Sequence, residues 1–335
     1  MDKPEDLLLD VQHLHTGFRL GDDYYDAVDD VSITLRKDEI LAIVGESGSG
    51  KSTLATSIIG LHDPRNTKVT GDILYNNLNL VGLNEALFDR IRGKDIGMIF
   101  QDPLAALNPL MRIGEQIEET LVYHTKMNKE ERESRVLELL NQVGIPNPER
   151  TARSYPHELS GGMRQRIVIA IAIACKPPII IADEPTTALD VTIQAQILDL
   201  LEDIQREMHS GIILITHDLG VVASICDRIA IMYGGKIVET GTVFEIFEHP
   251  QHPYTIGLLS CISNPNELEK KELHPIPGSP PDLLNIQENC PFADRCASAM
   301  KICKLHMPQE TQISATHRCS CWLQHPKACK GGEVQ

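Results

Sequence analysis

The chain has 335 residues, of which 42% are hydrophobic and 23% are charged, so it is long enough to bury one large core or two unequal ones. Its 31 basic and 47 acidic residues give a net charge of −16, which argues against a surface that binds the phosphate backbone of nucleic acids. No apolar stretch approaches the roughly 20 residues that span a bilayer, and the acidic start MDKPEDLLLD lacks the basic and apolar regions of a secretory signal, so we expect a cytoplasmic protein.

The region before residue 40 predicts a small β-sheet. Residues 7–14 and 31–35 carry the β-branched, partly alternating pattern of strands, and the acidic stretch at 21–30, GDDYYDAVDD, is expected to form the connecting turn. Aromatic side chains in this region can either stack on a nucleotide base or pack within the sheet, and the pattern alone does not choose between these roles. These side chains are Phe18, Tyr24 and Tyr25.

Residues 40–53, ILAIVGESGSGKST, contain the phosphate-loop pattern GxxxxGK[ST] between an apolar strand and a helix-compatible segment. The glycines allow successive backbone N–H groups to curl around phosphate oxygens at the positive end of a helix. Lys51 can reach the β- and γ-phosphates, and the Ser52 hydroxyl can bind Mg²⁺. The motif therefore predicts a nucleoside triphosphate site; the alternative is a glycine-rich turn beside a structural lysine.

The middle of the chain predicts a doubly wound α/β core. Residues 69–80 favour a short hairpin with a turn at Asn76-Asn77, and residues 103–176 have the apolar spacing of a mostly helical insertion. Parallel strands separated by helices are typical of such a core. Buried strands are expected at 40–44, 96–100, 179–182, 212–216 and 229–233, the last turning through Gly234-Gly235 into KIVETG.

Two acidic residues follow one of these strands directly. In IIIADEPTTALD, Asp183 and Glu184 lie at the carboxyl end of a fully apolar strand, which is the edge where open α/β sheets bind ligands. The first carboxylate is placed to hold Mg²⁺ and the second to polarise an attacking water. The alternative is a solvated pair of acids at a strand end.

The segment LSGGMRQR predicts a second anion site. Ser160, Gly161 and Gly162 open a helix, whose first N–H groups attract negative charge. One chain thus has two helix starts suited to phosphate.

The end of the chain has a different character. Residues from about 263 are rich in proline and charge, which indicates a linker, and a compact cysteine-bearing tail follows. Four thiolates suit Zn²⁺ or an iron–sulfur cluster, although the spacing is not the paired CxxC of a zinc ribbon. The predicted ligands are Cys290, Cys296, Cys303 and Cys321, with Cys319 as a competitor for Cys321 and with Cys175, Cys226, Cys261 and Cys329 as bystanders.

These motifs together resemble those of the ATP-binding-cassette (ABC) ATPases. LSGGMRQR resembles the signature motif of that family, Gln101 its Q-loop glutamine, residues 188–190 (Ala-Leu-Asp) its D-loop, and His217 its switch histidine. More narrowly, GESGSGKS, FQDPLAALNP, DEPTTALDVTIQAQIL, HPYTIGLL and the cysteine tail resemble the ATP-binding subunits of dipeptide/oligopeptide and nickel importers. This resemblance covers residues 7–322, and it departs at Asp38, where relatives usually have glycine.

The resemblance implies a fold and a domain organisation. The fold would be an α/β phosphate-loop NTPase (RecA-like) core with an antiparallel β subdomain, a helical signature subdomain and a small cysteine-rich C-terminal extension. The nucleotide-binding domain would cover 1–262, with its helical subdomain at about 103–176, and the extension 263–335.

The resemblance also implies roles for individual residues, with ATP and Mg²⁺ as cofactors. Glu184 would be the general base and His217 would contact the γ-phosphate. The signature residues Ser160, Gly161, Gly162 and Gln165 would act on the ATP of a partner subunit. Mg²⁺ would be held by Ser52, Gln101 and Asp183, and a [4Fe–4S] cluster, with zinc or no metal as alternatives, by the four predicted cysteines. ATP would be bound by Phe18, Gly45, Ser47, Gly48, Gly50, Lys51, Ser52, Thr53 and Gln101.

On this resemblance the chain is an ATPase that powers import of di- or oligopeptides from the cytoplasmic face of the membrane. Its partners would be two integral-membrane permease subunits, a second, homologous but different ABC ATPase and an extracytoplasmic solute-binding protein, with no nucleic acid. The alternatives are a nickel importer ATPase or a soluble ABC ATPase that acts in assembly, repair or translation. Against the soluble class, the chain has one phosphate loop and no sustained heptads.

Overall fold

The computed structural model describes residues 6–261, 276–281, 289–326 and 328. Most of the predicted linker and Cys329 lie outside these residues. The chain divides into two compact units, each of which is described by itself. The helical unit comprises Met1–Leu9, Thr34–Ile40 and Leu74–Ile215, and the phosphate-loop unit comprises Asp10–Ile33, Leu41–Ile73 and Thr216–Gln335.

Three parallel strands pair with one another in the helical unit. They are β6 (Ile96–Ile99), β7 (Ile179–Asp183) and β8 (Gly211–Thr216), and β7 pairs with both of its neighbours. All residues of β7 and β8 are buried, which agrees with their continuous apolar sequences, because parallel strands are usually covered on both faces. The prediction of buried parallel strands is confirmed here.

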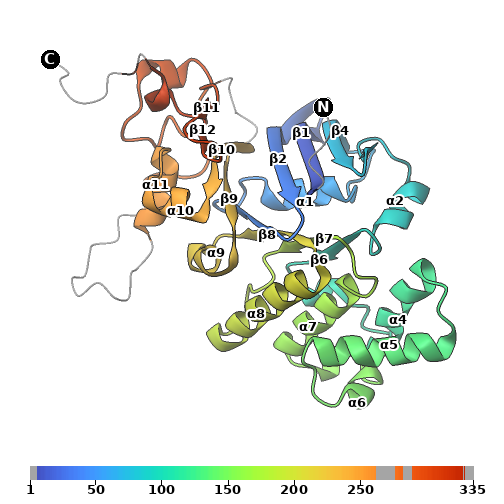
Figure 1. Cartoon of the computed structure of the whole chain (residues 1–335). Coiled ribbons are helices and arrows are strands. Elements are labelled where there is room, and N and C mark those ends of the chain that lie inside the picture. The colour runs from blue at the N-terminus through green and yellow to red at the C-terminus, as the bar shows by residue number, and fades with distance from the viewer. Residues whose placement is uncertain (1–5, 262–275, 282–288, 327, 329–335) are drawn as a thin grey trace, which may run out of the picture. The chain divides into compact units, whose positions relative to one another are not determined.

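The helices of this unit confirm the predicted helical insertion. Their starts are set by capping residues: Asn128 and Glu131 form a reciprocal capping box, and Asp190 accepts a hydrogen bond from the N–H of Ile193. In Figure 1, helices α4 to α7 lie together, and their contacts bury apolar side chains such as Leu121 and Leu139. The helices are α2 (Glu85–Ile91), α3 (Pro103–Ala106), α4 (Ile113–His124), α5 (Lys129–Gln142), α6 (Pro148–Ala152), the 3₁₀ helix η1 (Pro156–Glu158), α7 (Gly161–Ala172) and α8 (Val191–Met208).

The phosphate-loop unit contains paired sheet strands: β3 pairs in parallel with β9, and β9, β10 and β12 pair antiparallel in that order. Helix α10 packs against β10 and β9 (Figure 1). The elements of this sheet and its helices are β3 (Ile40–Val44), α1 (Lys51–Ile58), α9 (Leu219–Ile225), β9 (Arg228–Tyr233), β10 (Lys236–Thr242), α10 (Val243–Glu248), α11 (Pro253–Ser260), η3 (Lys301–Lys304), β11 (Thr311–Gln312), β12 (Arg318–Cys319) and η4 (Trp322–Gln324).

The predicted acidic turn at 21–30 is wrong. Strand β1 (Leu7–Leu20) turns at residues 21 and 22 directly into β2 (Asp23–Arg36), so most of GDDYYDAVDD is strand. Aspartate has a low propensity for strands. However, the Nδ1 of His13 on β1 lies 2.7 Å from the Oδ1 of Asp30 on β2. A similar pair joins His15 to Asp26, and such cross-strand pairs offset the poor strand propensity of the acids.

The predicted hairpin at 69–80 is confirmed as β4 (Thr67–Tyr75) and β5 (Leu78–Asn79). Asn76 and Asn77 both have left-handed backbone conformations, with φ of 46° and 64°. Asparagine tolerates this region better than most residues, and two such residues in sequence make the turn type that suits a tight hairpin.

Of the helices in the described part of the chain, none combines the length and apolar character needed to cross a membrane.

Candidate functional site

The predicted nucleotide residues divide between the two units. The phosphate loop, Phe18 and His217 belong to the phosphate-loop unit, whereas Gln101, the two strand-end acids and the signature segment belong to the helical unit. Each half of the predicted site therefore has its own geometry.

The phosphate loop joins the buried strand β3 to α1, as predicted. Gly48 and Gly50 have left-handed backbone conformations with φ of 78° and 103°, which glycine adopts without strain. A methyl group added at Gly45 would lie 2.1 Å from the carbonyl oxygen of Met232, and one at Gly50 would lie 2.3 Å from that of Ala27. Only glycine, which has no side chain, therefore fits at Gly45 and Gly50.

The Lys51 side chain lies within this loop. Its ammonium donates hydrogen bonds to the carbonyl oxygens of Gly45 and Glu46, at 2.8 and 2.9 Å, and the residue is almost completely buried. The positive charge is therefore held where the loop's N–H groups and the first turn of α1 also favour an anion.

The remaining predicted loop residues surround this charge with accessible groups. Ser47, Gly48 and Ser52 are exposed, and Thr53 is partly exposed. A serine hydroxyl exposed at the start of α1 is suited to bind a hydrated metal ion beside phosphates.

Phe18 is 38% exposed, and its ring packs in a T-shaped arrangement with that of His62, with the ring centroids 5.5 Å apart. Burial lowers the pKa of His62, so this partner is a neutral ring at neutral pH. Tyr24 is similarly exposed, so the rings of Phe18 and Tyr24 are both accessible to the base of a nucleotide.

In the helical unit the predicted acid pair follows β7. Asp183 is the last residue of the strand and is buried. Glu184 has a left-handed backbone conformation with φ of 45°, and its N–H donates to the carbonyl of Ile215 at 2.9 Å. Glutamate rarely adopts this conformation, and the hydrogen bond to Ile215 helps to hold it.

The structure brings Gln101 to this glutamate across 83 positions of sequence. The Gln101 Nε2 donates to the Glu184 Oε2 at 2.9 Å, and the Thr187 hydroxyl donates to the same oxygen at 2.9 Å. Both hydrogen bonds are made to the same oxygen, Oε2, and they orient the carboxylate.

The signature segment opens α7, and Ser160 caps that helix by accepting from the N–H of Met163 at 3.3 Å. Ser160 and Gly161 are exposed, whereas a methyl group at Gly162 would lie 2.9 Å from Ile193 of α8. Gln165, predicted to act with them, is buried, and its side-chain nitrogen has no hydrogen-bond partner. The exposed residues at the start of α7 are therefore Ser160 and Gly161.

His217 directly follows β8 and is exposed, and Asp218 caps helix α9 by accepting from the N–H groups of Gly220 and Val221. The position at a strand end agrees with the prediction.

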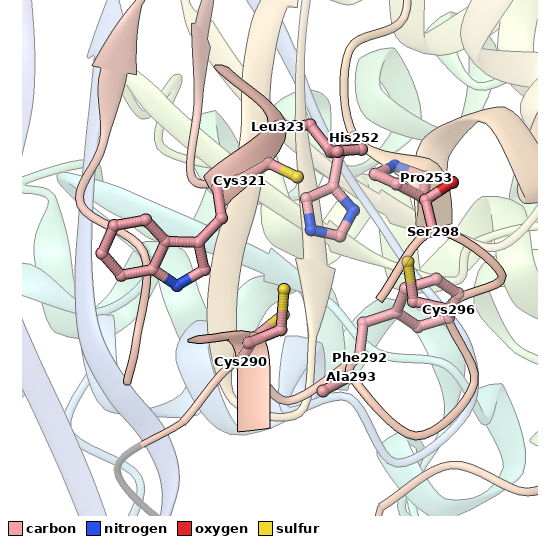
Figure 2. A pocket seen from close by; sticks show the side chains of 11 residues that line it. His252, Pro253, Cys290, Phe292, Ala293, Cys296, Ser298, Cys321 and Leu323 are labelled. Carbon is pink, nitrogen blue, oxygen red and sulfur yellow. The ribbon is translucent and has the colours of Figure 1, made fainter. Parts of the chain in front are cut away.

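A second candidate site lies in the cysteine tail. The four predicted cysteines line one pocket together with His252, Phe292 and Trp322. Figure 2 shows the sulfur atoms of Cys290, Cys296 and Cys321 and the imidazole of His252 around it. Cys319 does not line the pocket.

Burial disfavours the thiolate form of three of the pocket cysteines. Burial raises the pKa of Cys290 to about 12 and that of Cys321 to about 11, and it also raises the pKa of Cys296. Metal binding at such a site releases protons, because thiolates are the ligands.

Sequence reasoning missed His252 as a residue of this pocket, because it lies 38 positions before Cys290, the first of the four pocket cysteines. It is buried, and its Nδ1 accepts from the N–H of Tyr254 at 3.1 Å. Burial lowers the pKa of His252 to about 4, so the ring is neutral, and its remaining proton lies on Nε2.

A single zinc ion requires closely spaced thiolates. Four thiolates about 2.3 Å from one zinc lie within roughly 4 Å of each other. Within the described ranges, the one group that brings three ligand atoms within 4.8 Å of one another is His15, Asp26 and Asp29, and it contains no cysteine.

Comparisons with known proteins give a consistent result. The family described as "ABC transporter" matches residues 28–187, and the family described as "Oligopeptide/dipeptide transporter, C-terminal region" matches residues 238–303. The chain is 52% identical to the dipeptide transport ATP-binding protein DppD of Bacillus subtilis (strain 168), over 96% of each chain. It is 51% identical to the oligopeptide transport ATP-binding protein OppD of the same organism, over 96% of this chain and 90% of that one.

Solved structures agree. The dimeric post-hydrolysis structure of the ATP-binding cassette MJ0796, bound to ADP and Pi, has a TM-score of 0.64 and 31% identity, and it covers 70% of this chain and 99% of that one. The structure of cbiO1 from Clostridium perfringens, part of the ABC transporter complex cbiONQ, has a TM-score of 0.61 and 29% identity, with 76% and 96% covered.

Proposed function

The chain belongs to the ABC transporter family, among its dipeptide/oligopeptide transport ATP-binding proteins, and from this premise we propose how its residues divide the work of ATP-driven peptide import. It is an ATPase that powers peptide import. The observation that carries the proposed mechanism is the hydrogen bond from Gln101 to Glu184, because it joins a predicted Mg²⁺ ligand to the predicted base.

We assign ATP binding to the phosphate-loop unit. The loop N–H groups and Lys51 would bind the β- and γ-phosphates, Thr53 would add a hydroxyl, and Phe18 would stack on the adenine. His217 would contact the γ-phosphate. The buried ammonium in the loop and the exposed hydroxyls around it support this assignment.

Hydrolysis is assigned to residues of the helical unit. Asp183 and Gln101 would hold Mg²⁺ together with Ser52. Glu184, oriented by Gln101 and Thr187, would take a proton from the attacking water as its oxygen bonds to the γ-phosphorus and the bond to the β-phosphate oxygen breaks.

The signature segment would complete the ATP site of a partner cassette. The exposed Ser160 and Gly161 at the start of α7 support this role, and the dimeric form of the related MJ0796 cassette supports pairing of two cassettes. Gln165 is buried, which does not support its predicted contact with the ATP of a partner cassette. We propose that the partner is a homologous but different chain.

The proposed division of the chain follows these roles. Residues 1–262 would form the cassette, with the helical subdomain at about 103–176, and residues 263–335 would form the cysteine-rich extension. Helices α3 to α7 fall within the proposed helical subdomain, and the four pocket cysteines within the proposed extension.

We place the subunit on the cytoplasmic face of the membrane, bound to two permease subunits that receive peptide from an extracytoplasmic solute-binding protein. Several large apolar side chains are exposed on and around α3 and α4, where a membrane partner can cover them: Leu104, Leu110, Val122 and Tyr123. Co-purification from detergent-solubilised membranes tests this placement. Recovery of integral-membrane partners supports the importer, and recovery only from the soluble fraction contradicts it.

We further propose that the pocket thiols of Cys290, Cys296, Cys303 and Cys321 hold a [4Fe–4S] cluster. The gathering of the four cysteines in one apolar pocket supports this, and no cysteine of the described residues belongs to a group of three ligand atoms within 4.8 Å of one another. A bound cluster would cross-link the segments of the tail and supply a one-electron redox centre.

Anaerobic purification should therefore yield a coloured protein with about four iron and four sulfide ions per chain. Cys290→Ser should lose most of the iron. Cys319→Ser is the matched control, because Cys319 is buried in the same tail but does not line the pocket, and it should keep the full iron content. A colourless protein that contains zinc would contradict the cluster.

A further inference from the structure

A charged contact joins the cysteine tail to the phosphate loop within the phosphate-loop unit. Arg295 Nη1 lies 2.6 Å from Glu46 Oε2, and Arg295 Nη2 lies 3.0 Å from Glu46 Oε1. The Arg295 side chain is only 7% exposed. Glu46 is the second residue of the loop and its side chain is 25% exposed, and Arg295 directly precedes Cys296, so one partly buried ion pair connects two motifs that lie 249 positions apart.

Arg295 is fixed by its other contacts. Its Nε donates to the carbonyl of Pro277 at 2.9 Å, its Nη1 also donates to the Tyr233 hydroxyl at 3.1 Å, and its guanidinium lies over the ring of Phe292. A planar guanidinium that meets a carboxylate through two nitrogens has a defined direction, which lysine does not reproduce.

A second contact reaches the same loop residue. The Glu46 N–H donates to the Tyr254 hydroxyl at 2.9 Å, and the Tyr254 ring is fully buried against Tyr233 and Phe292. Tyr254 stands two positions after His252 of the cysteine pocket, at the start of α11. The loop residue is therefore held on its side chain and on its backbone.

These contacts affect nucleotide binding because Glu46 also contacts Lys51. Its carbonyl oxygen accepts from the Lys51 ammonium, so the position of Glu46 sets part of the position of Lys51. The Glu46 carboxylate also carries a negative charge beside a loop that must accept a triphosphate, and Arg295 neutralises that charge at short range.

We propose that Arg295 is a positioning residue of the nucleotide site: together with Tyr254 it holds Glu46, so that the affinity of the phosphate loop for ATP depends on the folded cysteine tail. The inference rests on the proposed binding of ATP at this loop. It makes the tail a determinant of ATP affinity through a contact of its own, whatever metal the pocket holds.

The test measures the dissociation constant of Mg²⁺ with a ribose-labelled fluorescent ATP on the purified full chain, in a Glu184→Gln background that suppresses turnover. Arg295→Met should weaken binding by about tenfold or more, because it leaves an uncompensated carboxylate in the loop. Arg295→Lys should fall between this variant and the parent. In the unmodified background, the KM for ATP should rise while kcat at saturating ATP changes little.

The double variant Glu46→Gln/Arg295→Met removes both charges and should recover most of the affinity that Arg295→Met loses. General damage to the fold does not predict this recovery. Lys304→Met is the control, since it breaks an exposed ion pair with Asp294 in the same tail and should leave the affinity unchanged. Thermal unfolding confirms that each variant is folded.

Tyr254→Phe keeps the buried ring and removes only the hydroxyl that accepts from Glu46, so it tests the inference even if Arg295→Met fails to fold. It should weaken binding by roughly three- to tenfold.

Unchanged affinity in a folded Arg295→Met protein overturns the inference, as does unchanged affinity in Tyr254→Phe, or a double variant that binds no better than Arg295→Met. Failure of the parent protein itself to bind the labelled ATP would instead contradict the proposed nucleotide site, and with it the inference.

Discussion

Replacement of Glu184 by glutamine should reduce ATP turnover by about 100-fold or more and leave ATP binding nearly unchanged, because a positioned general base contributes roughly 10²- to 10⁴-fold. The glutamine side chain has the same shape, and its amide oxygen can still accept from Gln101 and Thr187, as Glu184 Oε2 does. The substitution thus removes the proton acceptor and keeps the local geometry. Phosphate release and equilibrium binding of labelled ATP measure the two effects separately.

The matched control is Glu133→Gln on the surface of α5, which makes the same change of charge at an exposed residue paired only loosely with Lys129. It should hydrolyse ATP at the parent rate. If Glu184→Gln also kept the parent rate, Glu184 would not be the base, and the role assigned to its hydrogen bond from Gln101 would fall.

Replacement of Lys51 by methionine should remove most ATP binding and, with it, turnover. A charged hydrogen bond to phosphate contributes about 1.5–3 kcal/mol, so the dissociation constant should rise roughly 10- to 150-fold for each such hydrogen bond that the substitution removes. Equilibrium titration with labelled ATP and Mg²⁺ measures this change directly.

Lys51→Met also leaves the carbonyl oxygens of Gly45 and Glu46 without a charged donor, so we expect a modest decrease in thermal stability. Lys68→Met, at an exposed position of β4 in the same unit, is the control and should change neither property. A folded Lys51→Met protein with parent affinity would contradict the assignment of this loop to the phosphates.

The parallel strands and the phosphate loop were predictable from the sequence because their signals are local. A run such as IIIAD is apolar throughout when both faces of its strand are covered, and a glycine that permits a left-handed turn is visible in the motif. The acid pair was predictable for the same reason, because a predicted strand also predicts which residues lie at its end.

The features that could not be predicted depend on long-range partners. The acidic stretch at 21–30 forms a strand whose aspartates contact His13 and His15 of β1, and no local rule predicts these partners. The burial of Gln165 depends on how α7 packs. The pair of Glu46 with Arg295 joins two segments separated by most of the chain, and each residue alone resembles an ordinary surface charge.

The pocket of the cysteine tail lies between these cases. Cysteine spacing indicated the four thiols, and the structure gathers the same four in one pocket while excluding Cys319. His252 reaches the pocket from the start of α11, a segment that carries no recognisable ligand pattern. Its neighbour Tyr254 then connects this region to the phosphate loop.

The most direct measurement is uptake of a labelled di- or oligopeptide into proteoliposomes that contain the permeases, the partner ATPase, the solute-binding protein and this chain, with ATP supplied on the side of the ATPases. We predict uptake that requires ATP and that stops when this chain carries Glu184→Gln. Equal uptake without ATP, or with Glu184→Gln in place of the parent chain, would contradict the proposed role of this subunit in driving import.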